Sequence, residues 1–359
     1  MIDSLKKFKN KRVFITGNTG FKGSWLSYWL NLHEAKVYGF ADEIPSRPSF
    51  YEALSLKDDI TQVWGDIRDF KSLSKAINNI KPDFIFHLAA QSLVAKSYED
   101  PVLTFSTNFN GTLNLLEIAR KYTSKLNMVI ITSDKSYKNI EQLWGYKESD
   151  LIGGIDPYSA SKSATEMLIS GYFNSYFKNQ KKIKVAIARA GNVIGGGDWS
   201  ENRIVPDAIR AWSKNKTLNI RNPKSTRPWQ HVMEPLSGYI SLANILEKNP
   251  TINGEAFNFG PSSDQDYSVE YLLKKMQIYW PKKSWNVLSA KKFYESGLLK
   301  LNCEKANLML NWNSALNIDE NIEFTMNWYK NFYEKNDMRL FTNEQIKLYE
   351  NIFKERNVR

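Results

Sequence analysis

The segment YSASK carries the residue pair with the clearest potential for chemistry. It places Tyr158 and Lys162 four residues apart at the start of a predicted helix. Four residues make about one helical turn, so the tyrosine hydroxyl and the lysine ammonium share a face. A phenol with a pKa of about 10 is a poor base at neutral pH, but a neighbouring cation stabilises its phenolate. The pair therefore predicts a general base, although this spacing alone also occurs on ordinary amphipathic surfaces.

A second polar group follows an apolar run in the segment IITSDKSY. Ser133, Asp134 and Lys135 come at the end of this predicted strand. Ligands of open α/β sheets bind at the carboxyl ends of the strands. We therefore expect these side chains to meet Tyr158 in one crevice and to take part in catalysis; the alternative is a polar turn that only ends the strand.

Three glycines at intervals of three residues mark a candidate phosphate site in TGNTGFKG. Gly17 permits a tight turn, Gly20 lets the backbone approach a pyrophosphate, and Gly23 allows the next helix to pack closely on the strand. The start of that helix offers unpaired N–H groups and a positive dipole end. The spacing differs from G-x-G-x-x-G, and glycines alone are a weak signal. The strand, loop and helix around them nevertheless favour a dinucleotide.

Acidic residues after the next two strands are candidates for the nucleoside part of that ligand. Asp42 and Glu43 lie just beyond the second strand, where they either bond the adenosine ribose or form a polar turn. Asp66, in WGDIRD, follows another short strand and is placed to reach the adenine. The displaced acid leaves the choice between NAD and NADP open.

A parallel sheet is needed to bring these groups together, and the first half of the chain predicts one. Short β-branched runs alternate there with amphipathic helical patterns. The predicted strands are RVFIT, KVYGF, FIFHLA, MVIITS and KVAIARA, and the predicted helices are Lys22–His33, Pro101–Lys121 and Ser159–Lys178. Fully apolar strands between helices indicate an α/β fold with both sheet faces covered. We expect a Rossmann-type doubly wound parallel sheet.

The alternation of strands and helices ends after about Arg189. The stretch AGNVIGGGDWSENRIVP is rich in glycine and polar residues and predicts a loop. We therefore expect a dinucleotide-binding domain over residues 1–190 and a smaller mixed α/β substrate-binding region over 191–359. Residues 229–261 are expected to return to the first domain, because EAFNFG is typical of a core strand.

The composition is that of a globular, enzyme-sized chain of 359 residues, 42% hydrophobic and 24% charged. No apolar run approaches the roughly 18 residues of a membrane helix, and the N-terminus lacks a secretion signal, so we expect no membrane partner and a cytoplasmic location. The single Cys303 excludes an internal disulfide, and three histidines without ligand-like spacing argue against a metal centre. The net charge of +11 is spread along the chain, which indicates solvated lysines rather than a nucleic-acid partner.

Together these motifs resemble the extended short-chain dehydrogenase/reductase family. The resemblance rests on TGNTGFKG, HLAAQS, Asn108, Ser133, Tyr158 and Lys162. Within this family the chain is more similar to the bacterial CDP-glucose 4,6-dehydratases. That similarity rests on the stretches TGNTGFKGSWLSYWL, ITSDKSY, DPYSASK, ARAGNVIGGGDW and RPWQHVMEPLSGY, and it covers nearly the whole chain.

The resemblance implies a tightly bound NAD, recycled in each turnover, and a net dehydration of CDP-glucose to CDP-4-keto-6-deoxyglucose. Tyr158 would remove the C4 hydroxyl proton, Ser133 would bond the C4 oxygen, and Lys162 would tune Tyr158 and hold the ribose. Protonated Asp134 would assist departure of the C6 hydroxide. Lys135 stands where many related dehydratases have glutamate; it either takes the C5 proton or positions an acid or a water.

The resemblance also assigns binding residues. Cofactor contacts fall on Gly17, Thr19, Gly20, Phe21, Gly23, Asp66, Ile67, Ala89, Ala90, Asn108, Tyr158 and Lys162. Substrate contacts fall on Gln91, Ser133, Asn192, Arg203, Arg227 and His231, with Trp229 as an alternative to His231. Arg227 is the foremost diphosphate candidate, because a guanidinium bonds two oxygens at once. The family further implies a homo-oligomer, dimer or tetramer, with its seam along 101–121 and 159–178, and a role in surface-polysaccharide deoxysugar synthesis.

Other functions remain open at this point. A sugar-nucleotide epimerase or decarboxylase would use Tyr158 and Lys162 but needs no acid–base pair after Ser133. A dehydratase for GDP-mannose would carry glutamate at the position of Lys135, and dTDP- or UDP-sugars are further candidate substrates. A non-catalytic relative that binds RNA fits the charge of +11, but such relatives usually lose the tyrosine or the lysine, and both are present.

Overall fold

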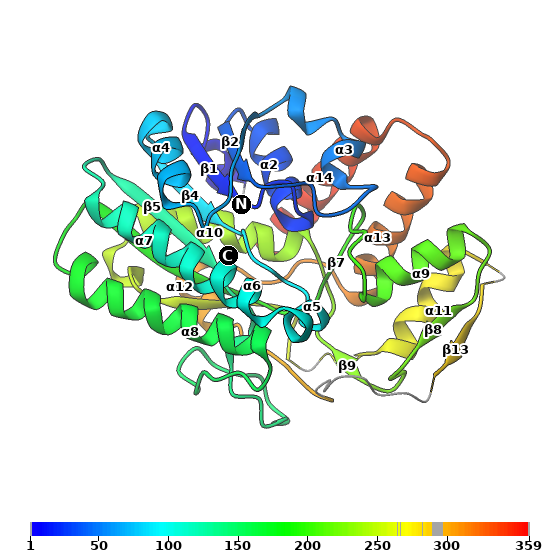
Figure 1. Cartoon of the computed structure of the whole chain (residues 1–359). Helices are drawn as coiled ribbons and strands as arrows, with labels where there is room; N and C mark the ends of the chain where they lie inside the picture. The colour runs from blue at the N-terminus through cyan, green and yellow to red at the C-terminus, as the bar shows by residue number, and fades with distance from the viewer. Residues whose placement is uncertain (1, 264, 266, 282, 289–296, 358–359) are drawn as a thin grey trace.

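The computed structural model of the chain describes residues 2–263, 265, 267–281, 283–288 and 297–357. A seven-stranded parallel sheet lies at its centre, in the order β11-β6-β5-β4-β1-β2-β3 (Figure 1). Its strands are β1 (Arg12–Thr16), β2 (Lys36–Ala41), β3 (Thr61–Trp64), β4 (Phe84–His87), β5 (Leu126–Ile131), β6 (Ile183–Ala190) and β11 (Ala256–Phe259). The order from β3 to β6 is that of the Rossmann dinucleotide-binding sheet. The predicted fold class is confirmed.

Helices cover both faces of this sheet because alternate strand residues point to opposite sides. In β1, Val13 and Ile15 face one hydrophobic core and Phe14 faces the other. The first core is closed by α2 (Phe21–Leu32), α10 (Met233–Lys248), α13 (Ile318–Tyr333) and α14 (Met338–Arg356). The second is closed by α4 (Phe70–Ile80), α7 (Gly111–Lys121) and α8 (Pro157–Tyr172). Burial on both faces explains why the strands are apolar along their whole length.

The start of α8 fixes the position of the predicted catalytic pair. Asp156 and Ser159 form a capping box, in which each side chain accepts a hydrogen bond from the other's backbone N–H. Pro157 occupies the first turn, where its missing N–H has no cost. The helix therefore begins two residues before the predicted Ser159 and carries Tyr158 in its first turn. A π-helical turn, η4 (Phe173–Phe177), continues it.

The predicted helix over 101–121 consists of three joined segments. These are α6 (Pro101–Phe105), the π-helical turn η2 (Ser106–Asn110) and α7. Short elements elsewhere connect the layers: α1 (Ile2–Lys6), α3 (Phe50–Ala53), α5 (Val94–Glu99), α12 (Glu304–Leu310), and the 3-10 turns η1 (Leu56–Asp58), η3 (Asp134–Ser136) and η5 (Pro250–Ile252). In the described parts of the chain, no helix has the length and apolar character to span a membrane.

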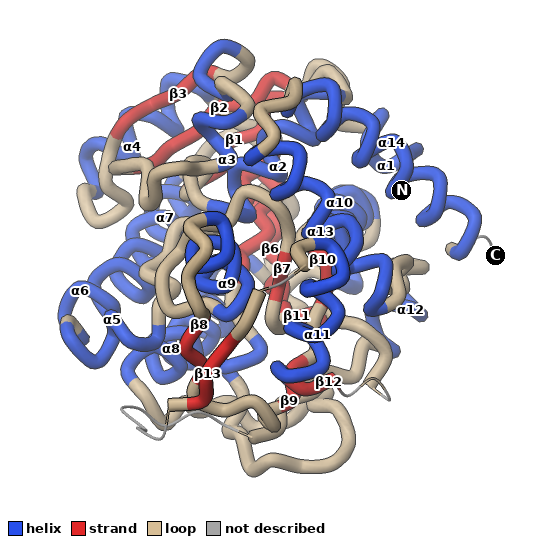
Figure 2. Tube along the Cα trace, turned by 90° about the vertical axis from the view of Figure 1, so that its right-hand side faces the viewer, coloured by secondary structure: helices blue, strands red, loops and turns tan. Residues whose placement is uncertain are grey.

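A group of small elements, which we call the small lobe, lies beside the sheet (Figures 1 and 2). It contains α9 (Ile204–Ser213), α11 (Val269–Tyr279), and the strands β8 (Leu218–Ile220), β9 (Thr226–Arg227), β12 (Tyr267–Ser268) and β13 (Trp285–Val287). Strands β8 and β13 pair in parallel, and β9 and β12 pair antiparallel. Each of these strands is only two or three residues long, so the lobe depends on packing rather than on an extended sheet.

The prediction of a loop over AGNVIGGGDWSENRIVP is partly wrong. Strand β7 (Val193–Ile194) lies within it and pairs in parallel with β10 (Gln230–His231), while α9 begins at Ile204. Two apolar residues between glycines have no local periodicity. Their partner strand comes from a distant part of the sequence, so only the tertiary structure reveals the pairing.

Candidate active site

The glycine loop between β1 and α2 leaves no room for side chains at two positions. Gly17 has a φ of +69°, and a Cβ there would lie 2.7 Å from the backbone nitrogen of Ala89. A Cβ on Gly23 would lie 2.1 Å from the carbonyl oxygen of Gly17, so α2 packs directly on the turn. At Gly20 the nearest atom to a Cβ would be that carbonyl oxygen, at 3.4 Å. The backbone at Gly20 is therefore the part of the loop that a ligand can approach.

Helix α2 begins at this loop without a side-chain cap at its Gly20 N-cap. A helix start of this kind presents N–H groups and a positive dipole end to an anion. The hydroxyl of Thr19 donates to the carbonyl oxygen of Glu43 at 2.6 Å, which holds the segment after β2 against the loop. Asp42 and Glu43 are exposed there. The loop and the two acids thus lie together, as a dinucleotide site requires.

Asp66, Ile67 and Ala89 also lie along this part of the molecule. The Nε of Arg68 donates to both carboxylate oxygens of Asp66, at 3.0 and 2.8 Å, and these bonds lower the pKa of Asp66. Ile67 is buried against Gly111, while the backbone of Ala89 abuts Gly17 and is followed by Ala90. Both oxygens of the Asp66 carboxylate thus already accept hydrogen bonds from Arg68. An adenine would have to bind this carboxylate together with Arg68.

Asn108 has a structural environment that the sequence did not reveal. Its side chain is buried, and its Oδ1 accepts a hydrogen bond from the Gln91 backbone N–H at 2.8 Å. Its Nδ2 donates to the Gln91 carbonyl oxygen at 3.1 Å and to the Ser161 hydroxyl at 2.9 Å. Asn108 therefore ties the loop after β4 to α8, the helix that carries Tyr158.

The turn after β5 holds an acid whose environment favours its protonated form. The Ser133 hydroxyl donates to Asp134 Oδ1 at 3.0 Å, whereas Asp134 Oδ2 is buried and has no hydrogen-bond partner in the described residues. Burial raises the pKa of Asp134, and the Lys135 ammonium and the Ser133 hydroxyl oppose this shift. A buried carboxyl with one free oxygen is suited to carry a proton.

Tyr158 and Lys162 are both buried near the start of α8. Burial raises the pKa of Tyr158 to about 12, and Ser133 and Arg203 act in the lowering direction. Burial lowers the pKa of Lys162 to about 8. The Lys162 Nζ donates to the Ile131 carbonyl oxygen at 3.3 Å, so its ammonium is bonded to the end of β5.

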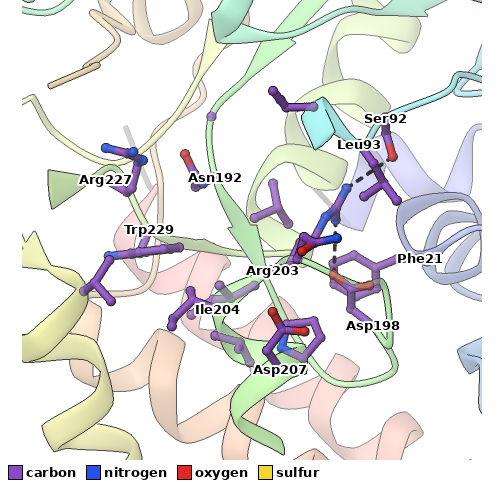
Figure 3. Close-up of a pocket in the computed structure, with 18 of the residues that line it drawn as sticks. Phe21, Ser92, Leu93, Asn192, Asp198, Arg203, Ile204, Asp207, Arg227 and Trp229 are labelled. Carbon is purple, nitrogen blue, oxygen red and sulfur yellow. Dashed lines mark hydrogen bonds and ion pairs between the residues drawn. The ribbon is translucent and has the colours of Figure 1, made fainter. Parts of the chain in front are cut away.

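A cavity of about 370 Å³ lies between the sheet and the small lobe, and Figure 3 shows part of its lining. The sheet contributes Ser133, Asp134, Lys135 and Tyr158, and the other wall contributes Asn192, Arg203, Arg227 and Trp229. The structure thus brings most of the predicted catalytic and substrate residues into one space. A carboxyl, an ammonium, a phenol and two guanidinium groups converge there, which suits acid–base chemistry on an anionic ligand.

Arg203 joins the two sides of this cavity. Its Nη1 pairs with Asp198 Oδ2 at 3.1 Å, and its Nη2 donates to the Ser92 hydroxyl at 3.2 Å (Figure 3). Arg227 enters the cavity from β9, which pairs with Tyr267 of β12. Figure 3 shows Arg227 beside Asn192 and Trp229.

Two predicted substrate residues lie elsewhere. The ring of His231 is fully buried and packs edge-on against Trp25 and Phe324, and burial lowers its pKa to about 3. The Gln91 side chain binds its own loop and α6: its Nε2 donates to the Thr104 hydroxyl at 2.8 Å and its Oε1 accepts from the Leu93 N–H at 2.7 Å. Neither residue lines the cavity, so both predictions are corrected; the alternative, Trp229, does line it.

The sequence interpretation missed two charged residues of the cavity, Lys22 and Asp198. Lys22 lines the cavity, and burial together with Lys162 and Arg203 lowers its pKa to about 7. Asp198 is buried and holds Arg203. Lys22 lies in the motif TGNTGFKG, beside the N-terminus of a helix, and Asp198 lies in the glycine-rich motif ARAGNVIGGGDW. Both positions could have indicated a charged residue of the site. Their orientation toward the cavity depends on the fold.

A Rossmann-type sheet with a glycine loop at its first turn and a Tyr–Lys pair at its carboxyl edge defines the short-chain dehydrogenase/reductase class. Residues 14–325 match the model of the GDP-mannose 4,6-dehydratase family, and the chain belongs to this family. The resemblance found in the sequence is thereby confirmed.

Relatives within the family narrow the comparison. The chain is 44% identical over 355 residues to the CDP-glucose 4,6-dehydratase of Salmonella typhimurium, covering 97% of this chain and 98% of the relative. It is 27% identical over 297 residues to the CDP-paratose 2-epimerase of Salmonella typhi, covering 75% and 84%.

Solved structures show the same fold at lower identity. The epimerase Mth375 of Methanothermobacter thermautotrophicus aligns with a TM-score of 0.79 at 22% identity, covering 94% of this chain and 96% of that one. The dTDP-glucose 4,6-dehydratase DesIV of Streptomyces venezuelae, with NAD and TYD bound, aligns with a TM-score of 0.77 at 21% identity, covering 89% and 97%.

Proposed function

We propose that this chain dehydrates CDP-glucose to CDP-4-keto-6-deoxyglucose with a bound NAD that ends each turnover unchanged. The observation that carries this proposal is the pair Asp134–Lys135 beside Tyr158 in one cavity of an NAD-type fold. The 44% identity with a CDP-glucose 4,6-dehydratase along almost the whole chain supports the choice of reaction and nucleotide. An epimerase has no need of an acid and a base at C5 and C6.

The residues around the glycine loop fit NAD. Gly20 leaves backbone open to the pyrophosphate, α2 offers its N-terminus, and Asp42 stands at the end of β2 for the adenosine ribose. A carboxylate at that position suits a free ribose hydroxyl, which favours NAD over NADP. When bound, the cofactor supplies a hydride acceptor at C4 and returns the hydride at C6.

Three side chains of the cavity move the protons, and a fourth, Ser133, donates a hydrogen bond. Tyr158 takes the proton of the C4 hydroxyl while Ser133 donates a hydrogen bond to the C4 oxygen. The resulting ketone acidifies the C5 proton, and Lys135, in its neutral amine form, removes it and returns it to C5 when C6 is reduced. Asp134, whose pKa is raised by burial, gives its proton to the departing C6 hydroxyl, so water leaves across C5–C6.

The tyrosine needs help to act as a base, because burial raises its pKa to about 12. Arg203 and the Ser133 hydroxyl lower this pKa, and a positively charged nicotinamide would act in the same direction. This arrangement ties deprotonation of Tyr158 to the oxidised cofactor, so the base forms when hydride transfer is possible.

Arginines of the far wall hold the diphosphate. Arg227 presents a planar fork that bonds two phosphate oxygens, and Arg203 adds a second guanidinium. Asn192 contributes a neutral amide between them and the catalytic residues. The substrate is thereby oriented with its hexose toward Tyr158 and its nucleoside toward β8.

We further propose a homodimer or tetramer in the cytoplasm. Exposed apolar side chains Val102 of α6, Met167 of α8 and Tyr176 of η4 lie on the two helical segments expected to form the seam. Light scattering coupled to gel filtration tests this: a monomer at micromolar concentration would contradict it.

The function is tested by incubating the purified protein separately with CDP-, dTDP-, UDP- and GDP-hexoses and recording product masses. Loss of one water from CDP-glucose without consumption of added cofactor is expected. Water loss from another nucleotide sugar would overturn the substrate, and an isomer of unchanged mass would favour an epimerase. Exchange of C5–H with solvent that persists in Lys135→Met would contradict Lys135 as the base.

A further inference from the structure

A buried ion pair lies behind the catalytic residues and has no part in the steps above. Glu166 of α8 and Arg189 of β6 have side chains only 2% and 5% exposed. The Arg189 Nε donates to both carboxylate oxygens, at 2.9 and 3.0 Å. Two charges removed from water cost free energy that such a pair recovers only with good geometry and further hydrogen bonds.

The pair makes those further hydrogen bonds with residues next to the site. The Thr132 hydroxyl donates to Glu166 Oε1 at 2.6 Å, and Thr132 directly precedes Ser133. The Arg189 Nη1 donates to the Tyr137 hydroxyl at 2.6 Å, which donates in turn to Asn258 Oδ1 at 2.9 Å. The network thus connects α8 with β5, β6 and β11, and it fixes both oxygens of Glu166.

Lys162 lies one helical turn before Glu166 on the same helix. The Glu166 carboxylate raises the pKa of Lys162, in opposition to the burial that brings it to about 8. The other titratable groups near Lys162 lie on three elements. The pKa of His87 on β4 is lowered to about 3, and the pKa of Lys22 on α2 is lowered to about 7. Burial is the main cause of both shifts, and the charge of Lys162 adds to them. The third group, Tyr158, lies in the first turn of α8. Glu166 is thus the anion that opposes loss of the Lys162 proton.

We propose that Glu166 is a positioning residue: held by Arg189 and Thr132, its carboxylate keeps Lys162 in the charged form that stabilises the Tyr158 phenolate. Arg189 and Thr132 act by holding this carboxylate at a fixed place behind the lysine. The inference rests on the proposed function in one respect: its test measures the rate of the proposed dehydration.

The Glu166→Gln variant tests the inference through the pH dependence of kcat. Glutamine keeps an oxygen for Thr132 and Arg189 but removes the charge, so Lys162 loses its proton at lower pH. We expect the alkaline limb of the profile to move about one pH unit toward acid, with KM for the sugar nucleotide changed less than about threefold. If the wild type is active and the alkaline limb of the Glu166→Gln profile does not move, the inference is wrong.

Three controls separate charge from structure. Glu166→Asp keeps the charge and should restore the limb. Glu117→Gln removes a carboxylate of an exposed Arg pair on α7 and should leave the profile unchanged. The double variant Glu166→Met/Arg189→Met replaces the ion pair by apolar side chains, a change that often preserves folding. Because it removes the Arg189 cation as well, it should shift the limb less than Glu166→Gln, which leaves that cation unpaired.

The outcomes distinguish the two proposals. A wild type without water loss from any nucleotide sugar contradicts the proposed function. An active wild type whose Glu166→Gln variant folds, by circular dichroism, and keeps the original alkaline limb contradicts the role of Glu166 alone.

Discussion

The sheet and the small lobe meet at one cavity but are built in different ways. The sheet side presents Ser133 and Asp134 from a strand end, joined by a hydrogen bond, and Tyr158 from the first turn of a capped helix. The lobe side presents Arg227 from a two-residue strand and Arg203 from the segment before α9. In the proposed function, the regular part of the molecule thus supplies the catalytic groups and the irregular part supplies the binding groups.

This difference follows from what each task requires. Proton transfer needs groups fixed within a fraction of an ångström, which packed strands and helices provide. A nucleotide can be bound by a surface of loops and short strands, because its binding free energy is divided among several contacts. Substitutions on the sheet side should therefore lower kcat, whereas those on the lobe side should raise KM.

The largest effect is expected for Tyr158→Phe, which removes the proposed base and leaves the ring. We expect kcat to fall about 10²- to 10⁴-fold with little change in KM, because a general base contributes roughly this factor. Product mass spectrometry over time measures it. A variant within tenfold of the wild type would show that another group accepts the C4 proton.

Arg227→Ala should act on binding instead. Losing charge-assisted hydrogen bonds worth roughly 1.5–3 kcal/mol raises KM about 10- to 100-fold. Arg227→Lys, which keeps the charge but loses the fork, should fall between the two. A fall in kcat with KM unchanged would contradict the prediction that substitutions in the small lobe act on substrate binding.

Glu234, at the start of α10, connects α10 to the segment that leads into α13. It is fully buried, and its carboxylate accepts from the backbone N–H groups of Ala315 and Leu316, yet burial raises its pKa to about 7. The folded state thus binds a proton more tightly than the unfolded chain, so its stabilising contribution is lost as pH rises from about 4.5 through 7.

Glu234→Gln should remove this dependence and be the more stable protein above pH 7, by roughly 1–2 kcal/mol. Urea unfolding at pH 5 and pH 8 measures the difference. Identical pH dependence in the two proteins would mean that Glu234 is ionised throughout.

The smallest effect is expected for Asp198→Asn. The change weakens the hold on Arg203 but leaves its guanidinium in the cavity, so we expect KM to rise about three- to tenfold, the effect of roughly 1 kcal/mol. Ser92→Ala, which removes the other contact of Arg203, is the matched comparison and should have a smaller effect. An increase in KM as large as that of Arg227→Ala would indicate direct contact between Asp198 and the substrate.

Much of the sheet side could be predicted from the sequence because its signals are local. The apolar runs, the glycine loop and the four-residue spacing of Tyr158 and Lys162 each reflect a regular element, and regular elements impose periodicity. The capping box at Asp156 and Ser159 was also readable, although the predicted helix began at Ser159 rather than at Pro157.

The lobe side could be predicted only in part. Trp229 and His231 lie two residues apart, and nothing in their sequence context says that the first lines the cavity while the second packs between Trp25 and Phe324. Strand β7 was missed for the same reason: its partner β10 is contributed by residues 230 and 231.

What the sequence by itself determined is the set of chemical groups and the class of sheet that carries them, because both follow from residue type and local spacing. Only the tertiary structure decided which groups share the cavity and in which direction their pKa values are shifted. Burial raises the pKa values of Asp134 and Tyr158 and lowers those of Lys22 and Lys162. Desolvation is produced by neighbours from distant segments, and no local pattern records it.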